Sequence, residues 1–101
     1  MFVKVSKTGD CHLYLPNAFS PNGDNINDGF APISDCVFEN YYFTIYDRWG
    51  KRLFEANDPT HLWNGTYQST MLPVGVYSYQ VVYQYFDESK NTKYGTVSLI
   101  R

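Results

Sequence analysis

The stretch VYSYQVVYQYF, residues 76–86, decides the fold class of this chain. Every odd-numbered position from 77 to 85 holds Tyr or Val, whereas Ser78, Gln80 and Gln84 occupy the other parity. Alternation of this kind, without Gly or Pro inside, is typical of a strand that buries one face. Ten such residues span about 33 Å, enough to run the length of a β-sandwich.

A second strand signal precedes this stretch. Residues 41–47 (YYFTIYD) alternate in the same way, with Phe43 and Ile45 on the expected inner face. Residues 51–55 (KRLFE) follow after a turn at Trp49-Gly50. The segment 41–55 therefore predicts a β-hairpin.

Two shorter segments complete the pattern. Residues 94–101 (YGTVSLIR) alternate Val97 and Leu99 with polar residues, and they predict a strand that pairs with 76–86 across the polar turn DESKNTK. Residues 11–15 (CHLYL) alternate leucines with His and Tyr. No stretch has a helical period. The sequence therefore predicts an all-β fold, an immunoglobulin-like antiparallel β-sandwich of about seven strands.

Length and composition agree with one small domain. The chain has 101 residues, of which 19% are aromatic and 18% are charged. We expect residues 1–10 to be a linker or chain start outside the fold. The net charge of −2 leaves no basic face for a phosphate backbone, so we expect no nucleic-acid partner. No apolar run approaches the roughly eighteen residues of a membrane span, and the chain begins without an export signal.

The only cysteines, Cys11 and Cys36, allow two interpretations. In a reducing compartment both would be small buried hydrophobic residues. If oxidised, they close a loop around a polar segment, and such a closure stabilises a protein by about 3–4 kcal/mol. We favour the disulfide because the enclosed segment has few apolar residues to hold it.

The sequence lacks a recognisable catalytic pattern. His12 lies on the expected outer face of a strand and His61 lies in a loop, and the two cysteines do not have the spacing of a zinc site. Paired carboxylates and a glycine-rich phosphate loop are also missing. Asn64 begins an NGT glycosylation sequon, but a tight turn at Asn64-Gly65 is the favoured interpretation. We therefore expect a protein that is not an enzyme.

The stretch NAFSPNGDNINDGF, residues 17–30, contains more side-chain oxygens than a simple turn needs. Four of its residues offer oxygen ligands suited to Ca²⁺: Asn22, Asp24, Asn27 and Asp28. Their spacing departs from that of an EF-hand loop, and Asx-turns explain the same residues without a metal. We expect Phe19 and Phe30 to anchor this loop in the core, with Ca²⁺ as the only candidate cofactor.

Another candidate site is the predicted turn in which Trp49 stands among three basic residues, Arg48, Lys51 and Arg52. An exposed aromatic residue among cations is typical of a protein-recognition surface. The alternative is a tryptophan folded back over the core, with the cations facing water. We favour this alternative because large aromatic side chains are usually mostly buried.

Five stretches, taken in order, resemble one family: PNAFSPNGDNIND (16–28), IYDRWGKRLFE (45–55), WNG (63–65), LPVGVYSYQVVY (72–83) and GTVSLIR (95–101). Together they are similar to the gliding-motility-associated C-terminal domain, the type B sorting domain of the Bacteroidetes type IX secretion system. The resemblance extends over nearly all of the chain from Pro16 to Arg101. Any one of these stretches alone would be a weak signal.

The resemblance implies a non-enzymatic sorting signal at the C-terminus of a large secreted or cell-surface protein. An upstream cargo region of the same chain would reach the periplasm, and the folded domain would direct it through outer-membrane receptor or shuttle components. The export signal would then lie far upstream, and Arg101 would be the end of the protein. The oxidising periplasm also favours a disulfide between Cys11 and Cys36.

Three candidate surfaces follow for a partner of such a domain. They are the 17–30 loop, the 48–52 turn and the last strand, where Leu99, Ile100 and Arg101 would offer an exposed edge to a partner's sheet. A different function stays open, an adhesive or carbohydrate-binding β-sandwich, because ten Tyr and two Trp suit stacking against sugars. Against it, most of these tyrosines share the parity of the expected core.

Overall fold

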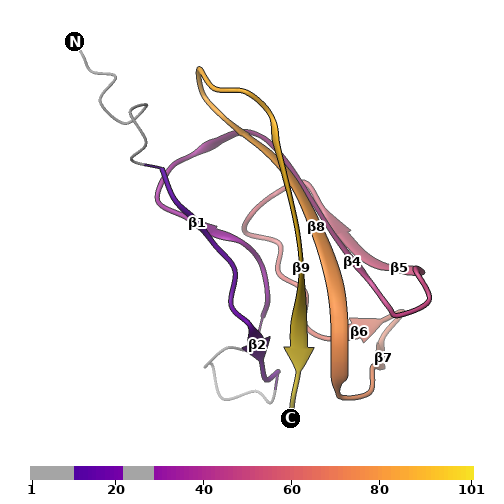
Figure 1. Cartoon of the computed structure of the whole chain (residues 1–101). Coiled ribbons are helices and arrows are strands. Elements are labelled where there is room, and N and C mark those ends of the chain that lie inside the picture. The colour runs from indigo at the N-terminus through magenta and orange to yellow at the C-terminus, as the bar shows by residue number, and fades with distance from the viewer. Residues whose placement is uncertain (1–10, 22–28) are drawn as a thin grey trace.

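The computed structural model describes residues 11–21 and 29–101, which form strands joined by turns and loops (Figure 1). Nine strands are present in these residues: β1 (Leu13–Tyr14), β2 (Ala18–Phe19), β3 (Ile33–Ser34), β4 (Phe38–Tyr46), β5 (Arg52–Ala56), β6 (Thr66–Tyr67), β7 (Thr70–Met71), β8 (Gly75–Tyr85) and β9 (Asn91–Leu99). Within the same residues no helix is long and apolar enough to cross a membrane. The predicted all-β class is confirmed.

The largest element is a five-stranded sheet in the order β2-β9-β8-β4-β5. All neighbours in it are antiparallel except β2, which runs parallel to β9. The order β9-β8-β4-β5 matches the G-F-C-C′ order of an immunoglobulin-like sheet. Five of the nine strands have only two residues, which explains why strand alternation predicted about seven strands.

The central strand β8 carries the alternation that the sequence predicts. Tyr77, Tyr79, Val81 and Tyr85 are buried, whereas Val76 on the opposite face is 60% exposed. β8 pairs with β4 on one side and with β9 on the other, so its inward side chains meet those of both neighbours. The predicted hairpin of β8 and β9 is confirmed, although its turn at 86–90 is shorter than the DESKNTK segment.

A shorter second layer covers the inner face of this sheet. It consists of the β1–β3 pair, the β6–β7 hairpin and a bridge between Phe30 and Trp63. Phe19, Phe30 and Trp63 are almost completely buried, and the Phe19 ring centroid lies 5.6 Å from that of Phe30 and 5.3 Å from that of Trp63. The expected anchoring of Phe19 and Phe30 in the core is therefore confirmed.

Glycine at position 95 allows a core tyrosine to cover the neighbouring strand. Gly95 on β9 stands directly opposite Tyr79 on β8. A Cβ atom at position 95 would overlap the hydroxyl and ring of Tyr79. The missing side chain therefore provides the space in which Tyr79 packs.

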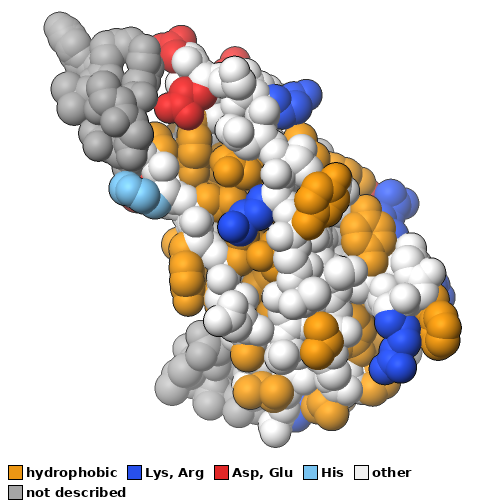
Figure 2. All heavy atoms as spheres, viewed as in Figure 1, with side chains coloured by type: hydrophobic (Ala, Val, Ile, Leu, Met, Phe, Trp, Pro, Cys, Tyr) orange, Lys and Arg blue, Asp and Glu red, His pale blue; other side chains and the backbone are white. Residues whose placement is uncertain are grey.

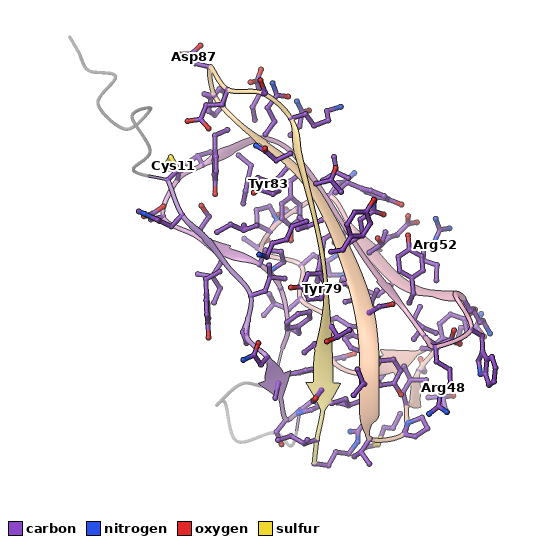
Figure 3. All side chains as sticks on the ribbon, in the orientation of Figure 1. Cys11, Arg48, Arg52, Tyr79, Tyr83 and Asp87 are labelled. Carbon is purple, nitrogen blue, oxygen red and sulfur yellow. A yellow bond between two sulfur atoms is a disulfide. The ribbon has the colours of Figure 1, made fainter. Side chains whose placement is uncertain are left out.

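Cys11 and Cys36 form a disulfide, with their Cα atoms 5.5 Å apart. It joins the segment before β1 to the segment after β3. The His12 amide donates a hydrogen bond to Asp35 Oδ1 at 2.8 Å beside it, and this bond lowers the pKa of the Asp35 carboxyl. The favoured disulfide is confirmed, and Figure 3 shows Cys11 at the end of the molecule away from Arg48.

Candidate functional site

Four segments that are distant in sequence meet at the end of the molecule where the chain terminates (Figure 1). They are the 47–51 turn, the 63–65 turn, the 72–75 loop and the terminal pair Ile100 and Arg101. This end is termed the C-terminal pole. Backbone hydrogen bonds, the Arg101 side chain and a shared hollow connect its parts.

The 47–51 turn is fixed by Asp47. Its Oδ1 atom accepts hydrogen bonds from the backbone N–H groups of Trp49 and Lys51, both at 2.9 Å. Its carbonyl oxygen accepts a third hydrogen bond from the Gly50 amide at 3.0 Å. Gly50 has a φ of 84°, a left-handed conformation that glycine adopts without steric cost. The predicted hairpin turn at Trp49-Gly50 is confirmed, and its backbone is rigidly held.

Trp49 projects from this turn into solvent, with 82% of its surface exposed. The favoured interpretation from the sequence, a tryptophan folded back over the core, is therefore wrong. Trp63 already fills the aromatic core at 1% exposure, and the turn held by Asp47 directs position 49 away from the sheet. The observed turn has the geometry of the other interpretation, an exposed aromatic tip among basic residues.

Hydrogen bonds hold the side chain of Arg101 against the pole. Arg101 Nη2 donates to the carbonyl oxygen of Leu72 at 2.8 Å and to that of Gly65 at 3.4 Å. The Leu72 amide donates to the same Gly65 oxygen at 3.0 Å. The Tyr77 hydroxyl donates to the Pro73 carbonyl at 2.6 Å, and burial raises the pKa of Tyr77, so this donor keeps its proton. The 63–65 turn, the loop and the end of β9 are thus connected.

A hollow of about 290 Å³ separates the 47–51 turn from the 72–75 loop. Arg48 and Trp49 line its turn side, and Val74 and Val76 line its other side. These two valines are 61% and 60% exposed, so the hollow has apolar walls that are open to a partner. Exposed apolar side chains that surround a concave surface are typical of a protein-interaction site.

Basic side chains belong to the turn on one side of this hollow and to the residue that follows the turn. Arg48 lines it directly, and the Lys51 Nζ atom lies 4.5 Å from the centroid of the Tyr67 ring. Arg52 pairs with Glu55 at 3.5 Å, but both side chains are more than half exposed, so this pair contributes little stability. Within residues 11–21 and 29–101, neither Arg48 nor Lys51 forms an ion pair. Figure 2 shows basic and hydrophobic side chains side by side at the lower right of the surface.

The end of the last strand is not an open edge. Leu99 is fully buried at 0% exposure, while the Ser98 amide donates to the Asn17 carbonyl at 2.9 Å and the Ile100 amide to that of Phe19 at 3.0 Å. The predicted edge at 95–101 is therefore wrong for its final residues, because β2 pairs with β9 there. Ile100 is half exposed, and Arg101 is exposed at the pole. In the described part of the chain, β9 has no second neighbour over 91–97.

The four candidate calcium ligands, Asn22, Asp24, Asn27 and Asp28, lie outside the described residues, so Ca²⁺ binding stays a prediction. Among the residues that are described, one close group of metal-ligating types consists of Cys11, Asp35 and Cys36. Both of its sulfur atoms belong to the disulfide. This group therefore stabilises the fold rather than offering thiolates to a metal.

Two other sequence-based interpretations can be compared with the structure. His12 and His61 are both exposed, as expected for surface residues. Gly65 has a φ of 80°, so the predicted tight turn at Asn64-Gly65 is confirmed. The Asn64 Oδ1 atom accepts a hydrogen bond from Thr66 Oγ1 at 2.7 Å inside that turn.

Sequence reasoning missed Val74 and Val76 as parts of the candidate site. The alternation of residues 76–86 does mark Val76 as an outward position, and Pro73 marks the preceding residues as a loop. Neither signal says that this loop lies beside Trp49. That proximity depends on the pairing of β8 with β4, which places the start of β8 beside the end of β4.

Fold and site together define a class of protein: a small β-sandwich domain with an exposed aromatic side chain and basic side chains on a turn at one end. The particular family follows from comparison with known proteins. The chain belongs to the CHU_C type IX secretion signal domain family, whose model matches residues 13–99. No curated protein matches the chain.

Family membership gives the domain its role as a C-terminal sorting signal for type IX secretion. Such a domain interacts with the secretion machinery, which directs the protein towards the outer surface. The family is not known for enzymatic activity. The carbohydrate-binding alternative is not favoured, and the burial of Tyr41, Tyr77, Tyr79 and Tyr85 agrees with that result.

Proposed function

We propose that the type IX machinery recognises this domain as a folded unit through its C-terminal pole. The domain thereby directs an upstream cargo region of the same chain from the periplasm across the outer membrane. An outer-membrane receptor or a shuttle component makes the contact. The domain itself acts by binding and catalyses no reaction, and the cargo is released or remains on the cell surface.

The observation that supports this proposal most strongly is the convergence of family-like stretches at the pole. IYDRWGKRLFE supplies the 47–51 turn, WNG supplies the 63–65 turn, LPVGV supplies the 72–75 loop, and GTVSLIR ends in Arg101. These stretches are far apart in sequence but adjacent in the folded domain. A signal built in this way exists only after folding, which favours recognition of a surface over recognition of a linear peptide.

The composition and rigidity of the pole also suit recognition. Trp and Arg are the residue types most enriched among the residues that dominate binding energy at protein interfaces. Trp49 stands on a backbone that Asp47 and Gly50 already hold, so little conformational entropy is lost when a partner binds. The pole therefore supports tighter binding than a flexible loop of the same composition.

Secretion of a reporter tests this proposal. An N-terminal export signal and a fluorescent protein are fused to residues 1–101 and expressed in hosts with and without a working type IX system. The Trp49→Ala variant removes the exposed ring of the pole. Phe86→Ala is the matched control, because Phe86 is an exposed aromatic residue, at 56%, in the β8–β9 turn at the opposite end of β8.

We expect fluorescence outside the cell only when the system is intact. Trp49→Ala should lower the secreted fraction by about tenfold or more, as for the loss of a residue that dominates an interface, and Phe86→Ala should leave it nearly unchanged. The melting temperatures of both variants should stay close to that of the original chain, because neither side chain is buried. Equal secretion by the two variants would show that the pole is not the recognised surface. A reporter trapped in the periplasm of both hosts would refute the sorting role itself.

A further inference from the structure

The C-terminal pole has a charge and shape that select one kind of partner, and this inference rests on the proposed function. Arg48 is the central residue. It lines the hollow of about 290 Å³ beside Trp49, and it also lines a second, more open hollow of about 530 Å³ with Val76, Ser78 and Thr96. A single guanidinium group therefore lies between two adjoining depressions.

The open walls of the first hollow argue for a side chain of another protein rather than a free small molecule. Sites for cofactors and drug-sized ligands usually enclose most of the ligand. The hollow beside Trp49, of about 290 Å³, is not enclosed in this way, because its wall residues Val74 and Val76 are more than half exposed. Such a depression suits one apolar side chain presented by another protein.

The charge of the pole argues for an acidic partner. The whole chain has a net charge of −2, yet Arg48, Lys51 and Arg101 gather at this end. Asp47 belongs to the same turn, and its Oδ1 atom already accepts two backbone hydrogen bonds. Arg48 forms no ion pair within the described residues, so its planar fork is available for a carboxylate, the group that it binds best.

We propose that the C-terminal pole binds an extended, acidic segment of a partner protein. One carboxylate of the segment pairs with Arg48 between the two hollows. An apolar side chain two residues away, on the same face of the extended segment, enters the hollow beside Trp49. Lys51, the last residue of the same turn, attracts a second carboxylate of the segment. The partner is thus recognised by alternation of acidic and apolar residues.

Binding of two synthetic peptides to the 101-residue chain tests this inference. The first peptide has eight residues in which Asp and Glu flank Leu and Phe, and the second replaces every Asp and Glu by Asn and Gln. Binding is followed through the indole N–H signals in ¹H–¹⁵N spectra. Trp49 is the reporter, and Trp63, whose Nε1 donates to the Thr66 carbonyl at 3.1 Å in the core, is the internal control.

We expect the acidic peptide to shift the Trp49 signal and leave that of Trp63 in place. The neutral peptide should bind at least about tenfold more weakly, and the affinity for the acidic peptide should fall as salt is added. Arg48→Gln should reduce this affinity by about tenfold. Arg52→Gln, which removes a cation already paired with Glu55, should change it by less than about twofold.

Equal binding of the two peptides, or no shift of the Trp49 signal by either one at millimolar concentration, would overturn the inference. Equal losses in Arg48→Gln and Arg52→Gln would do the same, because they would indicate general attraction to positive charge. The proposed function can hold even when this inference on the acidic partner fails. If Trp49→Ala abolishes secretion while the peptides bind equally, the pole remains the sorting surface and only the acidic chemistry of its partner is rejected.

Discussion

At the scale of single residues, Tyr41 is the clearest departure from good packing. Its side chain is 8% exposed, and its hydroxyl is buried without a hydrogen-bond partner in the described protein. A buried polar group of this kind costs about 1–3 kcal/mol. We therefore predict that Tyr41→Phe raises the free energy of unfolding by about 1 kcal/mol, measured by urea denaturation.

The matched control for this variant is Tyr77→Phe. Tyr77 has the same exposure, 8%, but its hydroxyl donates to the Pro73 carbonyl at 2.6 Å. Removal of the Tyr77 hydroxyl should lower the free energy of unfolding by about 1 kcal/mol, since a satisfied hydrogen bond is lost. A loss of stability in both variants would show that the Tyr41 hydroxyl has a stabilising partner after all.

The buried tyrosines also predict how stability depends on pH. Burial raises the pKa values of Tyr41, Tyr77, Tyr79 and Tyr85. In the unfolded chain a tyrosine loses its proton near pH 10, whereas the folded protein still retains it. Rising pH therefore favours unfolding above about pH 10. Below that pH the stabilisation that comes from these raised tyrosine pKa values is fully present. Melting temperatures should be constant from about pH 7 to 9 and fall above 10, and a constant value up to pH 11 would contradict this account.

The two tryptophans show what sequence can and cannot predict for single residues. Both stand beside a tight turn that contains glycine, Trp49 before Gly50 and Trp63 before Asn64-Gly65. One is 82% exposed and the other 1% exposed. The local sequence does not distinguish the two tryptophans. Their burial depends on which of the two turns faces the second layer. The position of Trp63 depends on its bridge to Phe30, a contact between residues far apart in the chain.

At the scale of elements, the β6–β7 hairpin is strained at its tip. Gln68 and Ser69 form a two-residue turn with φ values of 51° and 67°. A turn with positive φ at both positions is best made by Asn-Gly, and other residues in this conformation cost about 1–3 kcal/mol each. We predict that the double variant Gln68→Asn with Ser69→Gly raises the free energy of unfolding by about 1 kcal/mol.

The control for the hairpin variant is Ser89→Gly in the β8–β9 turn, where Ser89 does not have a positive φ. Glycine there should give no gain and a small loss, because it adds freedom to the unfolded chain. Thermal unfolding followed by circular dichroism distinguishes the two cases. A stability gain in the control as large as that in the hairpin would mean that backbone strain is not the cause.

Elements differ in how far the sequence predicts them. The long strands β4 and β8 follow from alternation, because each has one face that is buried over much of its length. In β9 only the end follows in this way, because only Val97 and Leu99 are buried there. Two-residue strands are too short to show a period of their own, and only β1 lies within a predicted stretch, residues 11–15. The parallel pairing of β2 with β9 depends on contacts between the two ends of the chain, and it is this pairing that closes the expected edge at Leu99. The candidate site was only partly predicted for the same reason.

At the scale of the whole molecule, the disulfide and the C-terminal pole lie at different ends (Figure 3). The Cys11–Cys36 bond spans 25 positions in the sequence and encloses β1, β2 and β3. The chain-entropy model assigns such a closure about 3–4 kcal/mol of stabilisation. We predict that Cys11→Ser combined with Cys36→Ser lowers the free energy of unfolding by about 3 kcal/mol in urea denaturation.

Reduction of the original chain is the control for the double serine variant. The reduced protein should unfold at nearly the same urea concentration as the variant, because both lack the same covalent bond. An unchanged midpoint after complete reduction would show that packing of Phe19 and Phe30 holds this layer without the disulfide. Since the pole is distant from Cys11, the acidic peptide should bind the folded variant with unchanged affinity.

The proposed function requires the type IX machinery to contact the C-terminal pole of the folded domain. Site-specific photo-crosslinking in secreting cells detects such a contact. The photo-reactive residue p-benzoylphenylalanine replaces Val74, which is 61% exposed in the hollow, or Phe86, which is 56% exposed at the opposite end of β8. We predict adducts with a component of the secretion machinery from position 74 and none from position 86. Adducts from position 86 alone, or equal adducts from both positions, would contradict the account.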